Sequence, residues 1–129
     1  MCCVHKLEDD RTGQVYLTNV ACRLLDVDTC LCGDYRRRRR RVPDCLRLTP
    51  DTLAHAVNWL PASCAYRRLF EGKGLPNWHP LVTGNPHSTE AAGMSARDRL
   101  IRVAPGEDMS RYVIEPSSGR LKAPRGCGR

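Results

Sequence analysis

Cysteine thiols are the residues of this sequence best suited to chemistry. Eight cysteines occur in 129 residues, and seven of them fall within the first 64 positions. These seven are Cys2, Cys3, Cys22, Cys30, Cys32, Cys45 and Cys64. Thiolates ligate zinc and iron, and in an oxidising compartment cysteines form disulfides instead. The N-terminal half is therefore predicted to hold a metal, an iron-sulfur cluster or a set of disulfides.

The compartment helps to separate these alternatives. Residues 1–14 contain no apolar stretch of the roughly 7 to 15 residues that a secretory leader needs. No run of about 18 consecutive apolar residues could span a bilayer. We therefore expect a cytoplasmic protein with no membrane segment, in which crowded thiols ligate metals more often than they form disulfides. Metal ligation is the favoured interpretation, while disulfides and unligated thiols stay open.

Composition explains why a metal would matter to this chain. Its length allows at most one domain, and a single Phe with 5% aromatic residues leaves few large side chains for a core. Small domains with a thin core often need a metal site in order to fold. The expected fold class is a small, metal-stapled α+β or irregular domain. Two or three short helices and a short hairpin-like strand segment would surround the cysteine cluster.

The N-terminal third contains one strand pattern. A turn is expected at residues 10–13, and the alternation of apolar and polar residues over 14–18 predicts a short strand. A short helix over residues 19–25 is expected to follow, because Asn19 could cap its first turn.

The most helical part of the sequence is residues 48–75. A capping hydroxyl, a proline and a carboxylate follow one another at residues 49–51, an order typical of a helix start. Apolar residues recur at i, i+4 and i+7 from Leu53, so this helix should pack on a neighbour until Pro61 ends it. A second helix is expected over 64–72, with glycine at its end.

The C-terminal part has little periodicity. Proline and glycine punctuate residues 76–129, and only 96–103 could form a further short element. We therefore expect a cysteine-rich domain over residues 1–103 and a basic, flexible tail over 104–129.

The cysteine spacing is irregular for a zinc protein. Zinc fingers draw their ligands from close C-x(2 to 4)-C pairs, because a tight turn lets two residues reach one ion. Here the sequence has the adjacent pair Cys2 and Cys3, a C-x-C at Cys30 and Cys32, and three single cysteines. Such spacing allows one or two sites of four ligands and suits zinc or an iron-sulfur cluster equally well.

Histidines could replace missing thiolates. His5 follows Cys3 closely and His79 lies in a Trp-His-Pro motif, so both are candidate extra ligands, with a solvated imidazole as the alternative. No glycine-rich cofactor loop and no paired carboxylates support catalysis. Clustered thiols favour ligation over a Cys-His nucleophile. No catalytic residue is predicted, and enzymatic turnover by the chain alone is the less favoured interpretation.

Several motifs follow one another in a specific order. They are VYLTNVACRLL at 15–25, TCLC at 29–32 with Tyr35, PDC at 43–45, LP at 60–61, CAYR at 64–67 and WHPL at 78–81. Over roughly residues 2–103 the chain thereby resembles the bacterial YcgN-type proteins, which belong to the YkgJ-like group of proposed zinc- or iron-chelating domains. The resemblance implies that Cys22, Cys30, Cys32, Cys45 and Cys64 belong to the chelating set.

The N-terminus departs from the family pattern. The family carries a C-x-x-C-C motif there; Cys2 and Cys3 match its last two cysteines, and Met1 occupies the preceding position. We therefore expect the natural protein to begin upstream of Met1. The chain also departs from the family after about residue 103, so Cys127 inherits no role. A related domain in flagellin lysine methylases implies a part in methyl transfer as a further alternative.

A run of six arginines supplies most of the positive charge. It comprises Arg36, Arg37, Arg38, Arg39, Arg40 and Arg41. The net charge is +7, and without the run 15 basic residues face 14 acidic ones. The run could bind RNA or DNA phosphates, contact an acidic protein or simply be a solvated loop, and only Tyr35 beside it could stack on a base. Its charge would also lower the pKa of nearby thiols. Composition indicates no oligomeric state.

Overall fold

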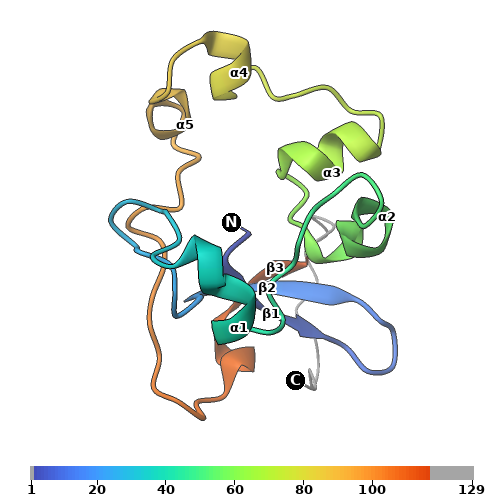
Figure 1. The fold of residues 1–129 in the computed structure, drawn as a ribbon, viewed down its shortest axis with the longest axis vertical. Coiled ribbons are helices and arrows are strands. Elements are labelled where there is room, and N and C mark those ends of the chain that lie inside the picture. Colours follow the sequence, from blue (N-terminus) through green and yellow to red (C-terminus); the bar gives the residue numbers. More distant parts are fainter. Residues whose placement is uncertain (1, 117–129) are drawn as a thin grey trace.

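A three-stranded antiparallel sheet organises the part of the chain that the computed structural model describes, residues 2–116 (Figure 1). Its strands are β1 (Val4–Glu8), β2 (Val15–Ala21) and β3 (Val113–Pro116), in the order β1-β2-β3. The central strand, β2, is buried along almost its whole length. The predicted strand at 14–18 is confirmed and extends further than expected.

The turn that joins β1 to β2 is held by one carboxylate. Asp9 Oδ1 accepts hydrogen bonds from the backbone N–H of Arg11 at 2.9 Å and of Thr12 at 3.2 Å. Gly13 has a φ of +67°, which glycine adopts without strain, and its N–H donates to the Asp9 carbonyl. The predicted turn at 10–13 is therefore confirmed, and it closes a β-hairpin.

The predicted helix over residues 19–25 is wrong. Asn19 to Ala21 continue β2, and the backbones of Asn19 and Ala21 are both hydrogen-bonded to Ile101. This part of β2 is paired on both sides, and Val20 and Ala21 are buried. Both effects favour a strand more strongly than the capping tendency of Asn19 favours a helix. Tyr16 is also buried, because β2 is covered on both faces.

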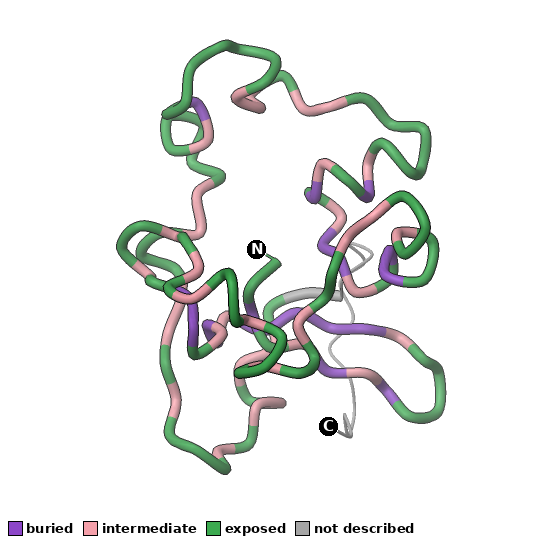
Figure 2. The backbone as a smooth tube through the Cα atoms, in the orientation of Figure 1, coloured by how far each residue is buried: buried purple, intermediate pink, exposed green. Residues whose placement is uncertain are grey.

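The helical segment after residue 48 lies beside the sheet in Figure 1 and packs on a neighbour, as expected, but its first helix begins at Leu53 and not at residue 50. It forms α2 (Leu53–Ala56), η2 (Val57–Trp59) and α3 (Ala65–Phe70), and residues 50–52 form a turn before α2. Val57 and Leu60 of the apolar stripe are 9% and 2% exposed, so the stripe is the packing face. Figure 2 shows buried residues in this segment and along the hairpin.

A buried arginine fixes α3 to the preceding segment. Arg67 Nη1 donates to the Leu60 carbonyl at 2.8 Å, and Arg67 Nε donates to Glu71 Oε1 at 2.8 Å. Arg67 is 8% exposed, so both partners satisfy a charge that is largely withdrawn from water. Because α3 begins directly after Cys64, these contacts also fix the position of that thiol.

The other helices are short. They are η1 (Tyr35–Arg37), α1 (Arg38–Arg41), α4 (Pro80–Thr83), α5 (Ser88–Ala91) and η3 (Met109–Tyr112). In Figure 1, α4 and α5 lie at the opposite end of the molecule from the sheet. The predicted class, a small α+β fold with irregular segments, is confirmed, although the helices are more numerous than the two or three expected.

Residues beyond 103 contribute to the sheet. Ile101 forms a bridge with Val20, and β3 pairs with β2 through Tyr16, Leu17 and Thr18. The domain boundary at residue 103 stays a prediction, and residues 117–129, with Cys127, lie outside the described residues. Between residues 2 and 116, no helix has the length and apolar character needed to cross a membrane.

Replacing Arg67 with alanine should destabilise the fold. The Arg67→Ala variant leaves the buried Leu60 carbonyl without this donor, so we expect its free energy of unfolding in urea to fall by about 1–3 kcal/mol. Arg68→Ala is the matched control, because Arg68 donates to the Gly74 carbonyl at an exposed position. Equal losses in the two variants would contradict the anchoring role of Arg67.

The hairpin turn should make stability depend on pH. Hydrogen bonds from the backbone of Arg11 and Thr12 hold the pKa of Asp9 below its usual value. The ionised carboxylate therefore stabilises the fold above about pH 4, and this contribution is lost as the pH falls through the depressed pKa. The urea midpoint of Asp9→Asn should lie below that of the wild type at pH 7, and the gap should close near pH 2.

The control for this prediction is Asp10→Asn. Asp10 is exposed in the same turn, and its side chain makes no hydrogen bond to other residues in the described range 2–116. This variant removes the same charge and should show a much smaller gap at pH 7. A gap for Asp9→Asn that does not change with pH would contradict the prediction.

Candidate metal centre

The seven cysteines within the described residues are all free thiols. Cys64 is buried, Cys2 and Cys3 are exposed, and the remaining four have intermediate exposure. The disulfide alternative therefore gains no support from these residues. The thiols come from the start of β1, the end of β2, the loop after it, the segment after α1 and the start of α3.

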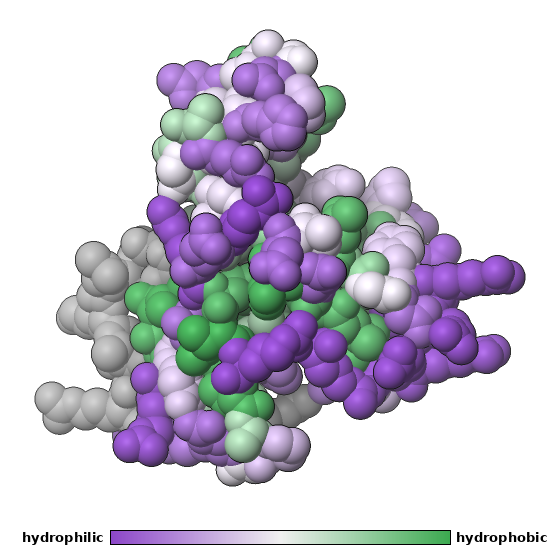
Figure 3. Space-filling view, turned by 90° about the vertical axis from the view of Figure 1, so that its left-hand side faces the viewer, coloured by the Kyte–Doolittle hydropathy of each residue, from purple (hydrophilic) through white to green (hydrophobic). Residues whose placement is uncertain are grey.

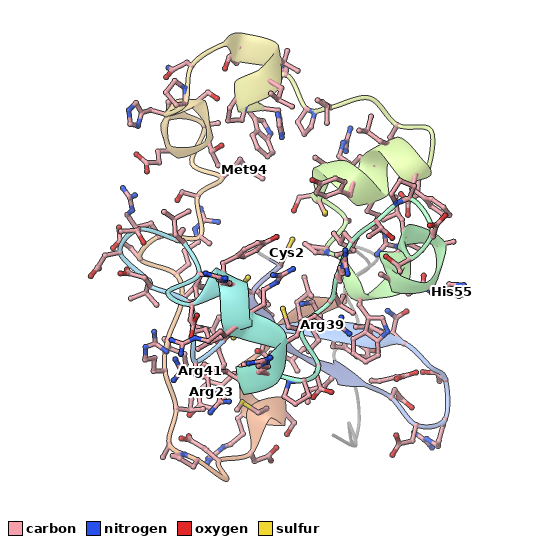
Figure 4. All side chains as sticks on the ribbon, in the orientation of Figure 1. Cys2, Arg23, Arg39, Arg41, His55 and Met94 are labelled. Atoms are coloured by element: carbon pink, nitrogen blue, oxygen red, sulfur yellow. The ribbon has the colours of Figure 1, made fainter. Side chains whose placement is uncertain are left out.

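Two of the thiols, 62 positions apart in the sequence, influence each other's ionisation. The neighbouring Cys2 thiol lowers the pKa of Cys64, and Cys64 in turn raises the pKa of Cys2. The backbone N–H groups of Arg67 and Tyr66 also favour the Cys64 thiolate. Figure 4 shows Cys2 near the middle of the molecule, between α1 and α3.

A second group of thiols surrounds Cys3. Partial burial raises the pKa of Cys3, and the thiols of Cys22, Cys45 and Cys32 raise it further, in decreasing order. The backbone brings Cys3 and Cys22 together, because Cys22 N–H donates to the Cys3 carbonyl at 2.9 Å. The pairing of β1 with β2 therefore places two thiols from distant parts of the sequence at the same end of the hairpin.

Asp26 organises the loop that carries Cys30 and Cys32. Its Oδ1 accepts hydrogen bonds from the backbone N–H of Asp28 at 2.9 Å and of Thr29 at 3.0 Å. Its carbonyl accepts from Cys30 N–H at 2.8 Å, and its N–H donates to the Leu31 carbonyl. Cys30 adopts a φ of +57°, an uncommon conformation for a residue other than glycine. The loop is therefore a tight turn that directs the two thiols differently.

The two cysteines of this loop differ in their contacts. Cys32 forms a bridge with Leu25 and belongs to the group around Cys3. The Cys30 thiol faces the carbonyl of Val27 at 3.8 Å. Cys45 follows a turn in which its N–H donates to the Val42 carbonyl at 3.0 Å. The chain between Cys32 and Cys45 thus leaves the thiols, forms η1 and α1, and returns to them.

A lysine lies among the thiols, and the sequence analysis did not single it out. Burial lowers the pKa of Lys6, whereas nearby thiols raise it; these belong to Cys2, Cys3, Cys22 and Cys64. Lys6 Nζ donates to the Cys2 carbonyl at 2.6 Å and to the Val4 carbonyl at 3.3 Å. The ammonium therefore holds the N-terminal segment in place through these hydrogen bonds. It also offsets negative charge on the thiolates. No sequence signal marks this role, because it depends on the pairing of the strands.

The thiols are not yet arranged as a finished site. Among residues 2–116, no three Cys, His, Asp or Glu side chains lie close enough together to hold one ion. The donor chemistry suits zinc or iron, because three further thiols lie within electrostatic range of Cys3 and thiolates are preferred ligands of both metals. The described arrangement brings these thiols near one another without joining them into one site.

The two candidate histidines lie in different surroundings. Partial burial and the neighbouring Lys6 lower the pKa of His5, which lies on β1. His79 caps α4, where its Nδ1 accepts from Leu81 N–H at 3.1 Å, far from the sheet in Figure 1. The roles of both as ligands stay predictions.

The comparisons with known proteins agree with the cysteine-rich character. The model of a family described as "Putative zinc- or iron-chelating domain" matches residues 1–65. A UPF0260 protein of Rhizorhabdus wittichii is 51% identical over 114 residues, which cover 88% of this chain and 77% of that protein. A UPF0260 protein of Gluconacetobacter diazotrophicus is 57% identical over 124 residues, which cover 96% and 76% of the two chains. No solved structure matches the chain.

Removing the Asp26 carboxylate should loosen the loop that carries Cys30 and Cys32. In Asp26→Ala, the amides of Asp28 and Thr29 lose their acceptor, so they should exchange with deuterium several-fold faster, as measured by mass spectrometry of short peptides. Asp28→Ala is the control, because its side chain makes no hydrogen bond to other residues within 2–116. Unchanged exchange in Asp26→Ala would show that the loop is held by other contacts.

Proposed function

The chain belongs to the same family as these UPF0260 proteins, and we propose that it binds zinc or iron through cysteine thiolates. Its own residues 1–65 match the domain that is described as zinc- or iron-chelating. The observation that carries the proposal is the group around Cys3. Three thiols from separate segments, those of Cys22, Cys45 and Cys32, raise the pKa of Cys3 there. Four thiolates are the number needed by a tetrahedral zinc ion or by an iron-sulfur cluster.

We assign the ligands to two neighbouring sets. The main set is Cys3, Cys22, Cys32 and Cys45, because the last three thiols raise the pKa of Cys3. Cys2 and Cys64 form the second set, because their thiols lie close enough to shift each other's pKa, and the lowered pKa of Cys64 favours the thiolate that a metal binds. Cys30 stays a candidate, since its thiol faces a backbone carbonyl.

Electrostatics determine what such a centre can bind. Four thiolates carry more negative charge than one divalent ion can neutralise, so the site needs positive charge nearby. Lys6 supplies it, because its ammonium lies within electrostatic range of four of the thiols. The arginines between Cys32 and Cys45 add positive charge to the same part of the chain. These charges favour the deprotonated thiols that ligation requires.

The proposed role is binding without turnover by this chain alone. A zinc ion would act as a structural staple for a domain with a thin core. Iron with inorganic sulfide would instead give electron transfer or sensing. A part in methyl transfer remains an alternative that rests on family resemblance. We place the protein in the cytoplasm, where the thiols would stay reduced.

Metal analysis of protein purified without oxygen tests the proposal. We expect stoichiometric zinc or iron bound to the full chain. Iron should come with acid-labile sulfide and absorbance near 400 nm, whereas zinc should leave the visible spectrum featureless. Cys3→Ser, Cys22→Ser, Cys32→Ser and Cys45→Ser should each lower metal content at least tenfold.

Cys127→Ser is the matched control for these variants, because Cys127 is the cysteine to which no ligand role is assigned. Its metal content should equal that of the wild type. Reduced wild-type protein that binds neither metal would refute the proposal, as would equal metal loss in Cys127→Ser.

A further inference from the structure

The arginine run forms a continuous helical segment. Tyr35–Arg37 make up η1 and Arg38–Arg41 make up α1, so residues three and four apart lie on the same side of the segment. None of the six arginines is buried. In Figure 4 the side chains of Arg39 and Arg41 lie around α1. Hydrophilic residues cover much of the face drawn in Figure 3. The run is therefore an ordered cationic surface on one short segment.

Three of the arginines already have partners within this segment. Arg37 and Arg41 form ion pairs with Asp34 at 3.1 Å and 3.2 Å. Arg38 lies over the Tyr35 ring, with its guanidinium carbon 3.8 Å from the ring centre, and also donates to the Tyr35 carbonyl. These contacts fix the segment's shape and neutralise its single carboxylate.

The other three arginines have no such partners. Arg36, Arg39 and Arg40 make no side-chain hydrogen bond or ion pair with any residue in the described range 2–116. Their spacing of i, i+3 and i+4 places them on one side of the segment. Three guanidinium groups on one surface, with the nearby carboxylate already neutralised, attract and hold anions.

A hollow lies beside these side chains. Its volume is about 660 Å³, and Asp34, Arg36, Arg37 and Arg40 line it. Tyr35, which lies between Asp34 and Arg36 in the sequence, is 65% exposed. The hollow thus gathers three guanidinium groups and one carboxylate, and the stack of Tyr35 with Arg38 belongs to the same short segment.

From this arrangement we propose that the segment 34–41 binds the sugar-phosphate backbone of a single-stranded nucleic acid. Arg36, Arg39 and Arg40 contact successive phosphates, and the Tyr35–Arg38 stack provides a surface for one base. The proposal is independent of the metal centre, because it uses none of the thiols.

The pattern favours a nucleic acid over an acidic protein. Phosphates of a single strand repeat at short, regular intervals, and planar guanidinium groups bind them bidentately. An aromatic ring beside the charges can stack on a nucleic-acid base, whereas it offers a carboxylate side chain no comparable contact. The site has no groove that would read base edges, so the binding should depend on salt and little on sequence.

The test measures binding of fluorescein-labelled 20-nucleotide RNA and DNA strands of mixed sequence to the full chain, by fluorescence anisotropy across a series of KCl concentrations. The triple variant Arg36→Gln, Arg39→Gln, Arg40→Gln should bind at least tenfold more weakly than the wild type. Its slope of log K against log salt should also be less steep by about 2, as expected for the loss of three phosphate contacts.

A control with the same loss of charge is Arg11→Gln, Arg47→Gln, Arg111→Gln. These arginines are exposed and lie outside the segment, so this variant should keep most of the wild-type affinity. Tyr35→Leu should weaken binding several-fold without changing the salt slope, since it removes stacking and no charge. RNA and DNA bound alike would identify the shared backbone as the ligand, and a difference would identify the 2′-hydroxyl as a further contact.

Three results would overturn the proposal. The first is the absence of binding by the wild type at 50 mM KCl. The second is an equal loss of affinity in both triple variants, which would show that only net charge matters. The third is a polyglutamate peptide of equal charge that binds as tightly as RNA, which would favour an acidic protein. Circular dichroism of each variant checks that the fold is retained.

Discussion

The pairing of β1 with β2 determines which thiols can meet. Val4 is opposite Ala21 in the register, so the residues just outside the two strands, Cys3 and Cys22, are brought together and joined by a backbone hydrogen bond. A shift of one residue would reverse the faces to which the side chains of β2 point. Both faces of β2 are covered, so such a shift would exchange side chains of different size between two packed faces, which close packing opposes. The packing of one strand thus specifies the chemistry at its end.

The thiols and Lys6 form a balanced group of charges. The thiols of Cys22, Cys45 and Cys32 raise the pKa of Cys3, so their ionisation opposes the loss of its proton. Lys6 acts in the opposite direction, and its hydrogen bonds to two backbone carbonyls keep it in place. A domain with a thin core can keep this group near its surface, because partly exposed thiols cost less to ionise than buried ones.

The sequence predicted the hairpin turn, the start of β2 and the segment from α2 to α3, because each carries local signals such as capping residues and apolar periodicity. It failed over 19–25, where strand pairing with Ile101 outweighed a local cap. Lys6 was missed because its neighbours come from distant parts of the chain. The start of α4 could have been found, since His79, Pro80 and Gly84 follow the usual order of cap, first-turn proline and C-terminal glycine.

The order of the strands has a consequence for synthesis. β2 lies between a strand made before it and β3, which is made almost a hundred residues later. While the ribosome completes that interval, one edge of β2 has no partner, and its backbone could pair with another chain. That edge of β2 therefore stays open to pairing along part of its length until residues 113–116 emerge and close the sheet.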